Sequence, residues 1–162
     1  LKSINFKNNK ISVIIAVGDV NTREKCRLEV KKNRLKLFTL IHPKSYVASS
    51  SKIEQGCILA PFTFIATKAN LEENIFINIY GSVGHHAFVG RSSVISPYAN
   101  INGKAQSGKM SFLGAKSLIM PGAKLGNLSK LSAGSILYKK TKDKCLVAGN
   151  PATEITLKFK TK

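Results

Sequence analysis

Two adjacent histidines, His85 and His86, are the residues of this sequence best suited to chemistry. An imidazole ionises near neutral pH, so it can accept a proton from a nucleophile during a reaction. The third histidine, His42, lies 43 residues before His85. A metal site needs about three converging ligands, and no acidic cluster completes a set with these imidazoles. We therefore predict no metal site; the pair either contains a catalytic base or consists of two solvated surface groups.

The element that must position this pair is a six-residue repeat, which runs from Ile41 to Leu137. Every sixth residue along it is Ile, Leu or Val in sixteen of seventeen cases, with Ser107 as the exception. Four residues after each of these comes a small residue, except at Ile75. A short fixed period indicates stacked units, and an α-helix cannot keep a six-residue pattern on one face. We predict a parallel β-helix over residues 41–141, with between five and six coils of three hexapeptides and no loop insertion.

Residues 18 apart in the sequence lie beside one another when three hexapeptides complete a coil. The third and fourth places of a hexapeptide point outward, which brings His85 and His86 to the surface. Thr67 then lies one coil before His85, and Gly103 lies one coil after it. A backbone N–H beside a histidine suits acyl transfer, because the imidazole takes the proton of the nucleophile while the N–H stabilises the oxyanion. His85 and Gly103 are therefore candidate catalytic residues.

A small, truncated α/β unit is predicted before the repeat, over residues 1–40. The continuous apolar run at residues 11–17 predicts a strand buried on both faces, and residues 35–40 predict a second short strand. Between them, a helix capped by Asn21 or Thr22 runs to about residue 33. Its inward side carries Cys26, Val30 and, as a further candidate, Leu28.

Gly18 and Asp19 turn the chain between that strand and that helix. In an open α/β sheet, ligands bind at the carboxyl ends of the strands, beside helix N-termini. We therefore predict that Gly18 and Asp19 bind substrate. At the other end of the chain, residues 142–162 are predicted to form a C-terminal tail, with a turn at residues 149–152 and a closing strand at residues 155–159.

The charge of the chain is strongly positive, since 26 Lys and Arg oppose 8 Asp and Glu, for a net charge of +18. Such a surface attracts polyanions such as nucleic acid, nucleotide phosphates, coenzyme A and anionic lipid headgroups, although it also serves solubility alone. The lysines are spread along the chain without an RNA-binding or helix-turn-helix motif. We therefore predict no nucleic-acid partner and leave an anionic membrane surface open.

The three cysteines are scattered, which argues against a disulfide framework and favours a reducing compartment. We accordingly expect a cytoplasmic protein. No apolar run approaches the ~20 residues of a membrane-spanning helix, and no signal peptide is recognisable. The first residue is Leu rather than Met, which suggests a fragment or a processed form.

Several segments together resemble the NeuD/PglD-type sugar acetyltransferases, a family of left-handed β-helix enzymes with a small α/β domain in front. Residues 78–86 are similar to the family's Asn-Thr-x-x-Ser-Val-x-His-Asp/Glu stretch, and residues 147–152 to the closing motif of coenzyme A-dependent hexapeptide transferases. Residues 16–19, followed by Arg23, resemble a nucleotide-contacting turn of the family, and residues 40–43 resemble its domain junction. The similarity covers nearly the whole chain.

This resemblance implies a transferase that moves the acetyl group of acetyl-CoA to an amino or hydroxyl group of a nucleotide-linked sugar, for surface polysaccharide or glycan biosynthesis. It also implies a homotrimer, with acetyl-CoA in the groove between neighbouring β-helices. His85 matches the general base, Gly103 matches the glycine whose N–H faces the thioester, and Asn78 matches a further residue of the substrate site. The positions that correspond to acetyl-CoA binding are Gly103, Ala133, Lys139, Asn150 and Pro151.

Two departures from the family leave other functions open. His86 stands at the catalytic position where the family has Asp or Glu, so His85 lacks the carboxylate that would strengthen it as a base. The opening strand and Gly-rich turn that help to hold the nucleotide sugar do not precede Leu1. A non-catalytic β-helix scaffold is therefore an alternative, and a small-molecule O-acetyltransferase is a second one, which the front α/β unit argues against. Thiol release from acetyl-CoA with a panel of UDP-linked amino sugars discriminates between these functions.

Overall fold

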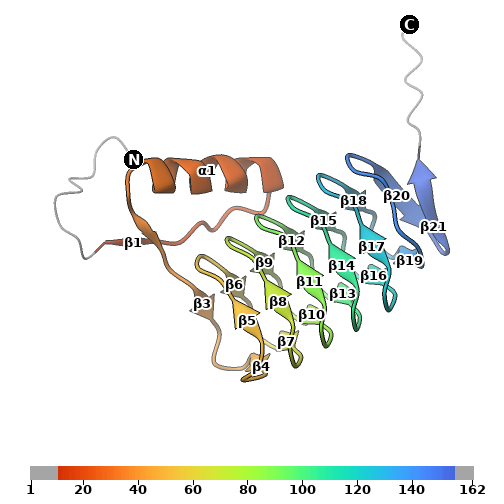
Figure 1. The fold of residues 1–162 in the computed structure, drawn as a ribbon, viewed down its shortest axis with the longest axis horizontal. Coiled ribbons are helices and arrows are strands. Elements are labelled where there is room, and N and C mark those ends of the chain that lie inside the picture. The colour runs from red at the N-terminus through yellow and green to blue at the C-terminus, as the bar shows by residue number, and fades with distance from the viewer. Residues whose placement is uncertain (1–10, 156–162) are drawn as a thin grey trace, which may run out of the picture.

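A parallel β-helix forms the body of the chain, as the six-residue repeat predicts (Figure 1). The computed structural model describes residues 11–155. Within them, two-residue strands from β3 to β19 follow one another at six-residue steps without an insertion. Consecutive strands belong to three different sheets in turn, so each coil has three sides. The predicted fold class and the uninterrupted repeat are confirmed.

The three sides of the β-helix are sheets of eight, six and five strands. The eight-stranded sheet contains β3 (Leu40–Ile41), β6 (Ile58–Leu59), β9 (Phe76–Ile77), β12 (Val94–Ile95), β15 (Phe112–Leu113), β18 (Lys130–Leu131), β20 (Leu146–Gly149) and β21 (Ala152–Ile155). The six-stranded sheet contains β4 (Tyr46–Val47), β7 (Phe64–Ile65), β10 (Ser82–Val83), β13 (Asn100–Ile101), β16 (Leu118–Ile119) and β19 (Ile136–Leu137). The five-stranded sheet contains β5 (Lys52–Ile53), β8 (Asn70–Leu71), β11 (Phe88–Val89), β14 (Gln106–Ser107) and β17 (Lys124–Leu125).

Each strand from β3 to β16 pairs in parallel with the strand 18 residues later, in register. Ser82 of β10, for example, pairs with Asn100 of β13. Because side chains alternate along a strand, the second residue of each two-residue strand from β4 to β19 faces the interior. In β3, the first strand of the β-helix, Ile41 is 42% exposed, although the repeat predicts it to be inward. The inward aliphatic residues form one continuous core. Ile75, which stands where the repeat otherwise has a small residue, also belongs to this core.

The chain bends between strands at a residue with left-handed backbone, which recurs in every hexapeptide from Gly56 to Gly134. Eleven of these fourteen residues are not glycine, although a positive φ is uncommon for residues with a Cβ. The ladder bonds between coils hold the bends in place, as when His86 N donates to Thr67 O at 3.0 Å. The small residue that follows each bend, such as Ala87, then packs into the core.

We name the three columns of bends after one residue in each. The His85 corner joins the six-stranded to the five-stranded sheet and consists of residues 48–51, 66–69, 84–87, 102–105, 120–123 and 138–141. The Glu73 corner joins the five-stranded to the eight-stranded sheet and consists of residues 54–57, 72–75, 90–93, 108–111 and 126–129. The Asn78 corner joins the eight-stranded to the six-stranded sheet and consists of residues 42–45, 60–63, 78–81, 96–99, 114–117 and 132–135.

The front unit consists of β1 (Ser12–Val13), α1 (Val20–Lys32) and β2 (Lys36–Leu37), with the two strands parallel. The predicted strand–helix–strand order is confirmed, but both strands are shorter than predicted. The prediction of a strand buried on both faces is wrong, because Ile14 is 42% exposed next to the buried Ile15. One side of this run packs against α1, so alternate side chains face away from it.

Two predictions about α1 also need correction. Asp19 caps the helix, rather than Asn21 or Thr22, because its carboxylate accepts hydrogen bonds from the backbone N–H and the hydroxyl of Thr22. Leu28 is 53% exposed, since it lies on the side of the helix opposite the buried Val30.

The buried side of α1 is mostly charged and faces the β-helix. Arg23 is fully buried; its guanidinium donates to the carbonyl oxygens of Ile15 and Val17 and to Asn74 in the Glu73 corner, at 2.6–3.2 Å. Burial lowers the pKa of Arg23 to about 10, so the side chain stays protonated at neutral pH. Arg23 therefore ties the segment before α1, including Val17 of the predicted turn, to the β-helix, and its guanidinium is buried between them.

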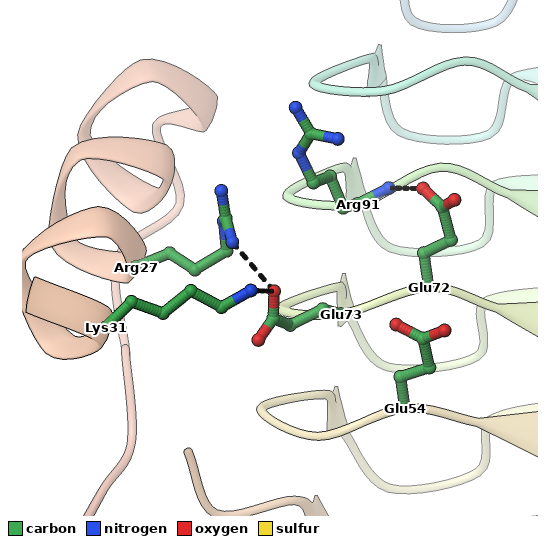
Figure 2. A pocket seen from close by; sticks show the side chains of 6 residues that line it. All are labelled: Arg27, Lys31, Glu54, Glu72, Glu73 and Arg91. Carbon is green, nitrogen blue, oxygen red and sulfur yellow. Dashed lines mark hydrogen bonds and ion pairs between the residues drawn. The ribbon is translucent and has the colours of Figure 1, made fainter. Parts of the chain in front are cut away.

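Arg27 continues this contact, at the edge of a pocket of about 410 Å³ (Figure 2). It pairs with Glu24 on its own helix and with Glu73 on the β-helix, each at 2.8 Å. The hydrogen bonds from Arg27 lower the pKa of Glu24 to about 2. Burial alone would raise the pKa of Glu73, but hydrogen bonds from Lys31 and Arg27 hold it below its ordinary value.

The tail closes the last coil. Strand β20 pairs in parallel with β18, and β21 pairs antiparallel with β20, with a turn at Asn150–Pro151 between them. The predicted turn is confirmed. The closing strand begins at Ala152, three residues before its predicted start, and residues 156–159 of that prediction lie outside the described residues.

Candidate active site

His85 and His86 lie on the exposed edge of the third coil, directly after β10. His85 O accepts a ladder hydrogen bond from Lys104 N at 2.8 Å, and His86 N donates to Thr67 O at 3.0 Å. The backbone of both residues is therefore tied to the coil on either side. The two side chains leave a rigid edge, as the outward third and fourth places predict.

The His85 ring lies directly over Gly103, one coil further along, as the 18-residue stacking predicts. A Cβ added to Gly103 would overlap Nε2 of His85, so any other residue there would displace the ring. Glycine is needed at this position for space, since Gly103 does not have a positive φ. The side chain of His85 and the backbone of Gly103 thus form one surface.

The N–H of Gly103 is free for a ligand, because within residues 11–155 no acceptor takes a hydrogen bond from it. Its carbonyl oxygen, by contrast, accepts from Gly122 N at 3.2 Å. The N–H groups of Thr67 and His85 are likewise without an acceptor in this part of the chain. What distinguishes Gly103 is the imidazole beside it, so a proton acceptor and a hydrogen-bond donor lie together.

The second imidazole contacts the first. Nδ1 of His85 and Nδ1 of His86 are 3.2 Å apart, and the two rings are nearly perpendicular, at 87°. Nδ1 of His85 is thereby occupied by His86, while Nε2 lies on the Gly103 side of the ring. Sequence reasoning placed both histidines at the surface but did not predict this contact.

The remaining predicted residues fall into separate places along the β-helix. Lys139 lies in the His85 corner, two coils beyond Gly103, whereas Asn78 and Ala133 lie in the Asn78 corner. Asn78 Oδ1 accepts a hydrogen bond from Ile79 N at 2.8 Å. The six-stranded sheet separates Asn78 from His85, so one chain does not bring these two residues together.

Gly18 and Asp19 lie beside the eight-stranded sheet, where they line a pocket of about 310 Å³ with Val20, Phe112 and Lys130. The hydrogen bonds from the Thr22 side chain and backbone lower the pKa of Asp19. The eight-stranded sheet is the side opposite the His85 corner, since that corner joins the other two sheets. The predicted substrate turn and the histidine pair of the same chain are therefore on different sides.

The six-stranded sheet and its two corners form a face without carboxylates. None of these residues is Asp or Glu, and all of them belong to the described part of the chain. Lys68 and Lys104 occupy the same place as His86 in the preceding and the following coil. The 18-residue stacking could have found these two flanking cations in the sequence. The lysines of this face are Lys44, Lys68, Lys104, Lys116, Lys139 and Lys140.

Across residues 11–155, no group of three His, Cys, Asp or Glu side chains is arranged to hold a metal ion. No helix in the same residues is both long and apolar enough to cross a membrane.

Solved structures with the same fold are known, although no protein-family model and no curated protein matches the sequence. The acetyltransferase domain of PglB from Neisseria gonorrhoeae is 25% identical; the match covers 93% of this chain and 74% of that one, with a TM-score of 0.88. The same domain was solved with acetyl coenzyme A, and that structure is 26% identical, with 89% and 70% coverage and a TM-score of 0.85. A variant of GDP-perosamine N-acetyltransferase from Caulobacter crescentus, in complex with CoA and GDP-perosamine, is 23% identical, with 90% and 69% coverage and a TM-score of 0.87.

The chain has the fold of the NeuD/PglD-type sugar acetyltransferases. The resemblance that the motifs indicate is thereby confirmed, together with the left-handed β-helix that it implies. The match to the PglB domain spans the front unit as well as the repeat, since it covers 93% of the chain. The structural relatives of this chain are acetyl-CoA-dependent enzymes.

Proposed function

We propose that this chain transfers the acetyl group of acetyl-CoA to an amino or hydroxyl group of a nucleotide-linked sugar, in surface polysaccharide or glycan biosynthesis. The observation that carries the proposal is the His85 imidazole, which lies against Gly103 on an exposed edge, where the Gly103 N–H has no acceptor within residues 11–155. The structural match to the acetyltransferase domain of PglB supports it.

His85 is the general base of the proposed reaction. Its Nε2 takes the proton of the attacking amine or hydroxyl while that atom bonds to the thioester carbonyl carbon. The Gly103 N–H donates to the oxyanion of the resulting tetrahedral intermediate. The carbon–sulfur bond then breaks, and the imidazolium of His85 returns the proton to the departing thiolate. Atoms and charge balance without a metal or a redox partner.

The carboxylate-free face suits coenzyme A, which carries several phosphate charges. Lys139 and Lys140 lie along the His85 corner, on the same edge as Gly103. Lysine attracts phosphate strongly, and no acidic side chain on this face opposes it. We propose that acetyl-CoA lies along this edge with its thioester at Gly103, and that Ala133, Asn150 and Pro151 complete its site.

A homotrimer would complete the active site. Asn78 and His85 lie at opposite edges of the six-stranded sheet, so the Asn78 corner of one copy must meet the His85 corner of the next if both serve one substrate. Large apolar side chains support burial of this face, since six aromatic residues on it are 41–57% exposed: Tyr46, Phe62, Phe64, Tyr80, Tyr98 and Tyr138.

The nucleotide sugar would then approach from the copy that supplies Asn78. Gly18 and Asp19 lie beside the eight-stranded sheet, which borders the Asn78 corner, so this turn and Asn78 are on the same side of one chain. The GDP-perosamine enzyme with the same fold binds a nucleotide sugar together with CoA. We propose that Gly18, Asp19 and Asn78 position the acceptor sugar of one copy against His85 of its neighbour.

We also infer a reducing compartment such as the cytoplasm, because all three cysteines are unpaired.

Thiol release from acetyl-CoA tests the proposal directly. The full chain is incubated with acetyl-CoA and a panel of UDP-, GDP- and dTDP-linked amino sugars, and free thiol is measured against a no-sugar control. We expect release that depends on one sugar class and is lost in His85→Ala. No release with any acceptor, at acetyl-CoA concentrations that saturate binding, would favour the non-catalytic scaffold, for which His86 at the acidic position is the supporting observation.

A further inference from the structure

We propose that His86 is the positioning partner of His85: its neutral ring accepts the Nδ1–H of His85 and so leaves Nε2 of His85 unprotonated on the Gly103 side. This inference rests on the proposed role of His85 as the base. His86 itself touches no reacting atom in this arrangement. It acts through the tautomer and the orientation of its neighbour.

The contact between the two Nδ1 atoms requires one proton between them. At 3.2 Å, a hydrogen bond forms only if one nitrogen carries a hydrogen and the other offers its lone pair. Two hydrogens at this contact would collide, and two lone pairs would repel. The pair therefore holds together with one ring as the donor and the other as the acceptor.

The position of Gly103 decides which ring donates. Nε2 of His85 is the ring atom nearest to a Cβ built on Gly103, so it is the ring nitrogen that faces this glycine, whose N–H has no acceptor within residues 11–155. A base there needs a lone pair on Nε2, and a neutral imidazole with a bare Nε2 carries its hydrogen on Nδ1. His85 is then the donor of the pair, and His86 accepts on Nδ1 while its own Nε2 carries the hydrogen toward solvent.

Within residues 11–155, His86 is the one group that contacts a ring nitrogen of His85 at hydrogen-bond distance. The six-stranded sheet and both of its corners lack Asp and Glu. The charged side chains that flank His86 in the neighbouring coils are Lys68 and Lys104, which have donors only. His86 therefore works as a neutral acceptor, where a carboxylate would supply a negative charge.

Nitrogen-15 NMR of the two imidazoles in the full chain at neutral pH tests the tautomers without reference to activity. We expect His85 to carry its hydrogen on Nδ1 and His86 to carry it on Nε2. In His86→Ala, we expect His85 to lose its preference for the Nδ1–H form. A wild-type His85 with its hydrogen on Nε2 would overturn the proposal, whatever the enzyme assay shows.

Kinetics test whether that tautomer matters. We expect His86→Ala to lower kcat about 10- to 100-fold with little change in KM, the range seen when the partner of a metal-bound histidine is removed. His86→Asn should restore most of the activity, because its amide oxygen can accept the hydrogen bond and Asn tolerates a left-handed backbone. Leu128→Ala is the matched control, since Leu128 is exposed, lies in the Glu73 corner away from the site, and has nearly the same φ, 57° against 58° at His86.

These outcomes separate the two proposals. A chain that is inactive on every acceptor but shows the expected tautomers would refute the proposed function and leave the contact in place. An active chain in which His86→Ala shifts the tautomer of His85 without changing kcat would refute the positioning role alone. An equal loss of activity in Leu128→Ala and His86→Ala would show that a left-handed alanine, and not the lost acceptor, is responsible.

Discussion

The His85 corner and the Glu73 corner share one backbone and differ in what covers them. Both bend at left-handed residues, with φ of 58° at His86 and 61° at Asn74. Asn74 is fully buried beneath the front unit, and its side chain is bonded to Arg23 and Ser92. His86 occupies the equivalent place and is exposed. The repeat therefore sets the geometry of both corners, while the front unit decides which of them is structural and which stays open to a ligand.

Charge follows the same division. In the Glu73 corner, Glu73 is paired with Arg27 and Lys31 of α1. In the His85 corner the charged side chains are all lysines, and no carboxylate compensates them. A buried charge requires a partner within the chain, whereas an exposed row of cations is available to an anionic ligand.

Removal of the His85 imidazole should have the largest effect and should be confined to catalysis. His85→Ala is expected to lower kcat about 10²- to 10⁴-fold, because general acid–base catalysis contributes this much. Stability and acetyl-CoA affinity should hardly change, since the exposed ring fills no cavity. Turnover, the melting temperature and acetyl-CoA binding are measured on the same samples. Thr67→Ala, at the same place one coil earlier, is the control; wild-type turnover in His85→Ala would show that the base lies elsewhere.

Truncation in the core beneath both corners should reduce stability and leave the chemistry intact. Ile95→Ala removes a fully buried side chain from an interior that is one side chain thick, and we expect a loss of roughly 2–5 kcal/mol in the free energy of unfolding. Ile95→Val, the conservative comparison, should cost roughly 0.5–1.5 kcal/mol. Denaturant unfolding measures both. A loss below that of the valine variant would contradict the inward register at this coil.

The core register is what the sequence could predict most fully. Each hexapeptide repeats the same pattern, with one inward residue in a two-residue strand and a small residue four positions later. One inward side chain on each of the three sides is enough to fix which residues of a coil face the core. The site was predictable to the extent that it depends on this register: the positions of His85 and Gly103 follow from the 18-residue stacking. The contact between the two Nδ1 atoms depends on side-chain torsions, on which the repeat carries no information.

The contact of the front unit was not predictable for a different reason. The buried side of α1 carries Arg23, Glu24 and Arg27. The pattern of apolar and charged residues along a helix predicts that a charged side faces solvent, so it predicts the wrong side here. Only the partners on the β-helix, such as Glu73 and Asn74, make burial of these residues possible. They are about 50 residues away in the sequence, and no local signal connects the two segments.

Removal of Arg27 should loosen the front unit and leave the β-helix folded. Arg27→Ala deprives two buried carboxylates of their shared partner, although Lys31 and Arg91 remain near them. We expect a loss of about 3 kcal/mol, at the lower end of the range for a broken buried ion pair. Hydrogen exchange should increase in α1 but not in the coils. Lys25→Ala, on the exposed side of α1, is the control, and uniform exchange across the chain in Arg27→Ala would contradict a local contact.

Acid should loosen the same contact before it affects the core. The hydrogen bonds from Arg27 lower the pKa of Glu24 from 4.5 to about 2. Since the folded pKa is the lower one, the stabilisation is fully present above pH 4.5 and is lost as the pH falls toward 2. It amounts to roughly 2–3 kcal/mol. Stability measured between pH 2 and 6 should therefore depend on pH less steeply in Glu24→Gln than in the wild type, and parallel curves would contradict the role of this carboxylate.

Loss of the Ser107 hydroxyl should have the smallest effect, although Ser107 occupies an aliphatic place in the same coil as Ile95. Its Oγ contacts Ser111 Oγ, which is also bonded to Ser93 Oγ at 3.0 Å. Ser93 Oγ in turn donates to Gly108 O at 2.9 Å. Ser107→Ala removes one end of this buried chain of hydroxyls and leaves Ser111 with a partner, so we expect a loss of about 0.5–1.5 kcal/mol.

Ser111→Ala gives the sharper comparison, because it removes the middle of the chain. Ser107 Oγ would then be buried without its partner, and the penalty for an unsatisfied hydroxyl is about 1–3 kcal/mol. Denaturant unfolding of both single variants and of the double variant separates the terms. We expect the double variant to lose less free energy of unfolding than the two single variants combined. With both hydroxyls removed, Ser107 no longer leaves a buried hydroxyl without a partner. If Ser107→Ala alone proves as damaging as Ile95→Ala, the three serines act as one unit, and this stretch of the interior is held together by hydrogen bonds as much as by aliphatic packing.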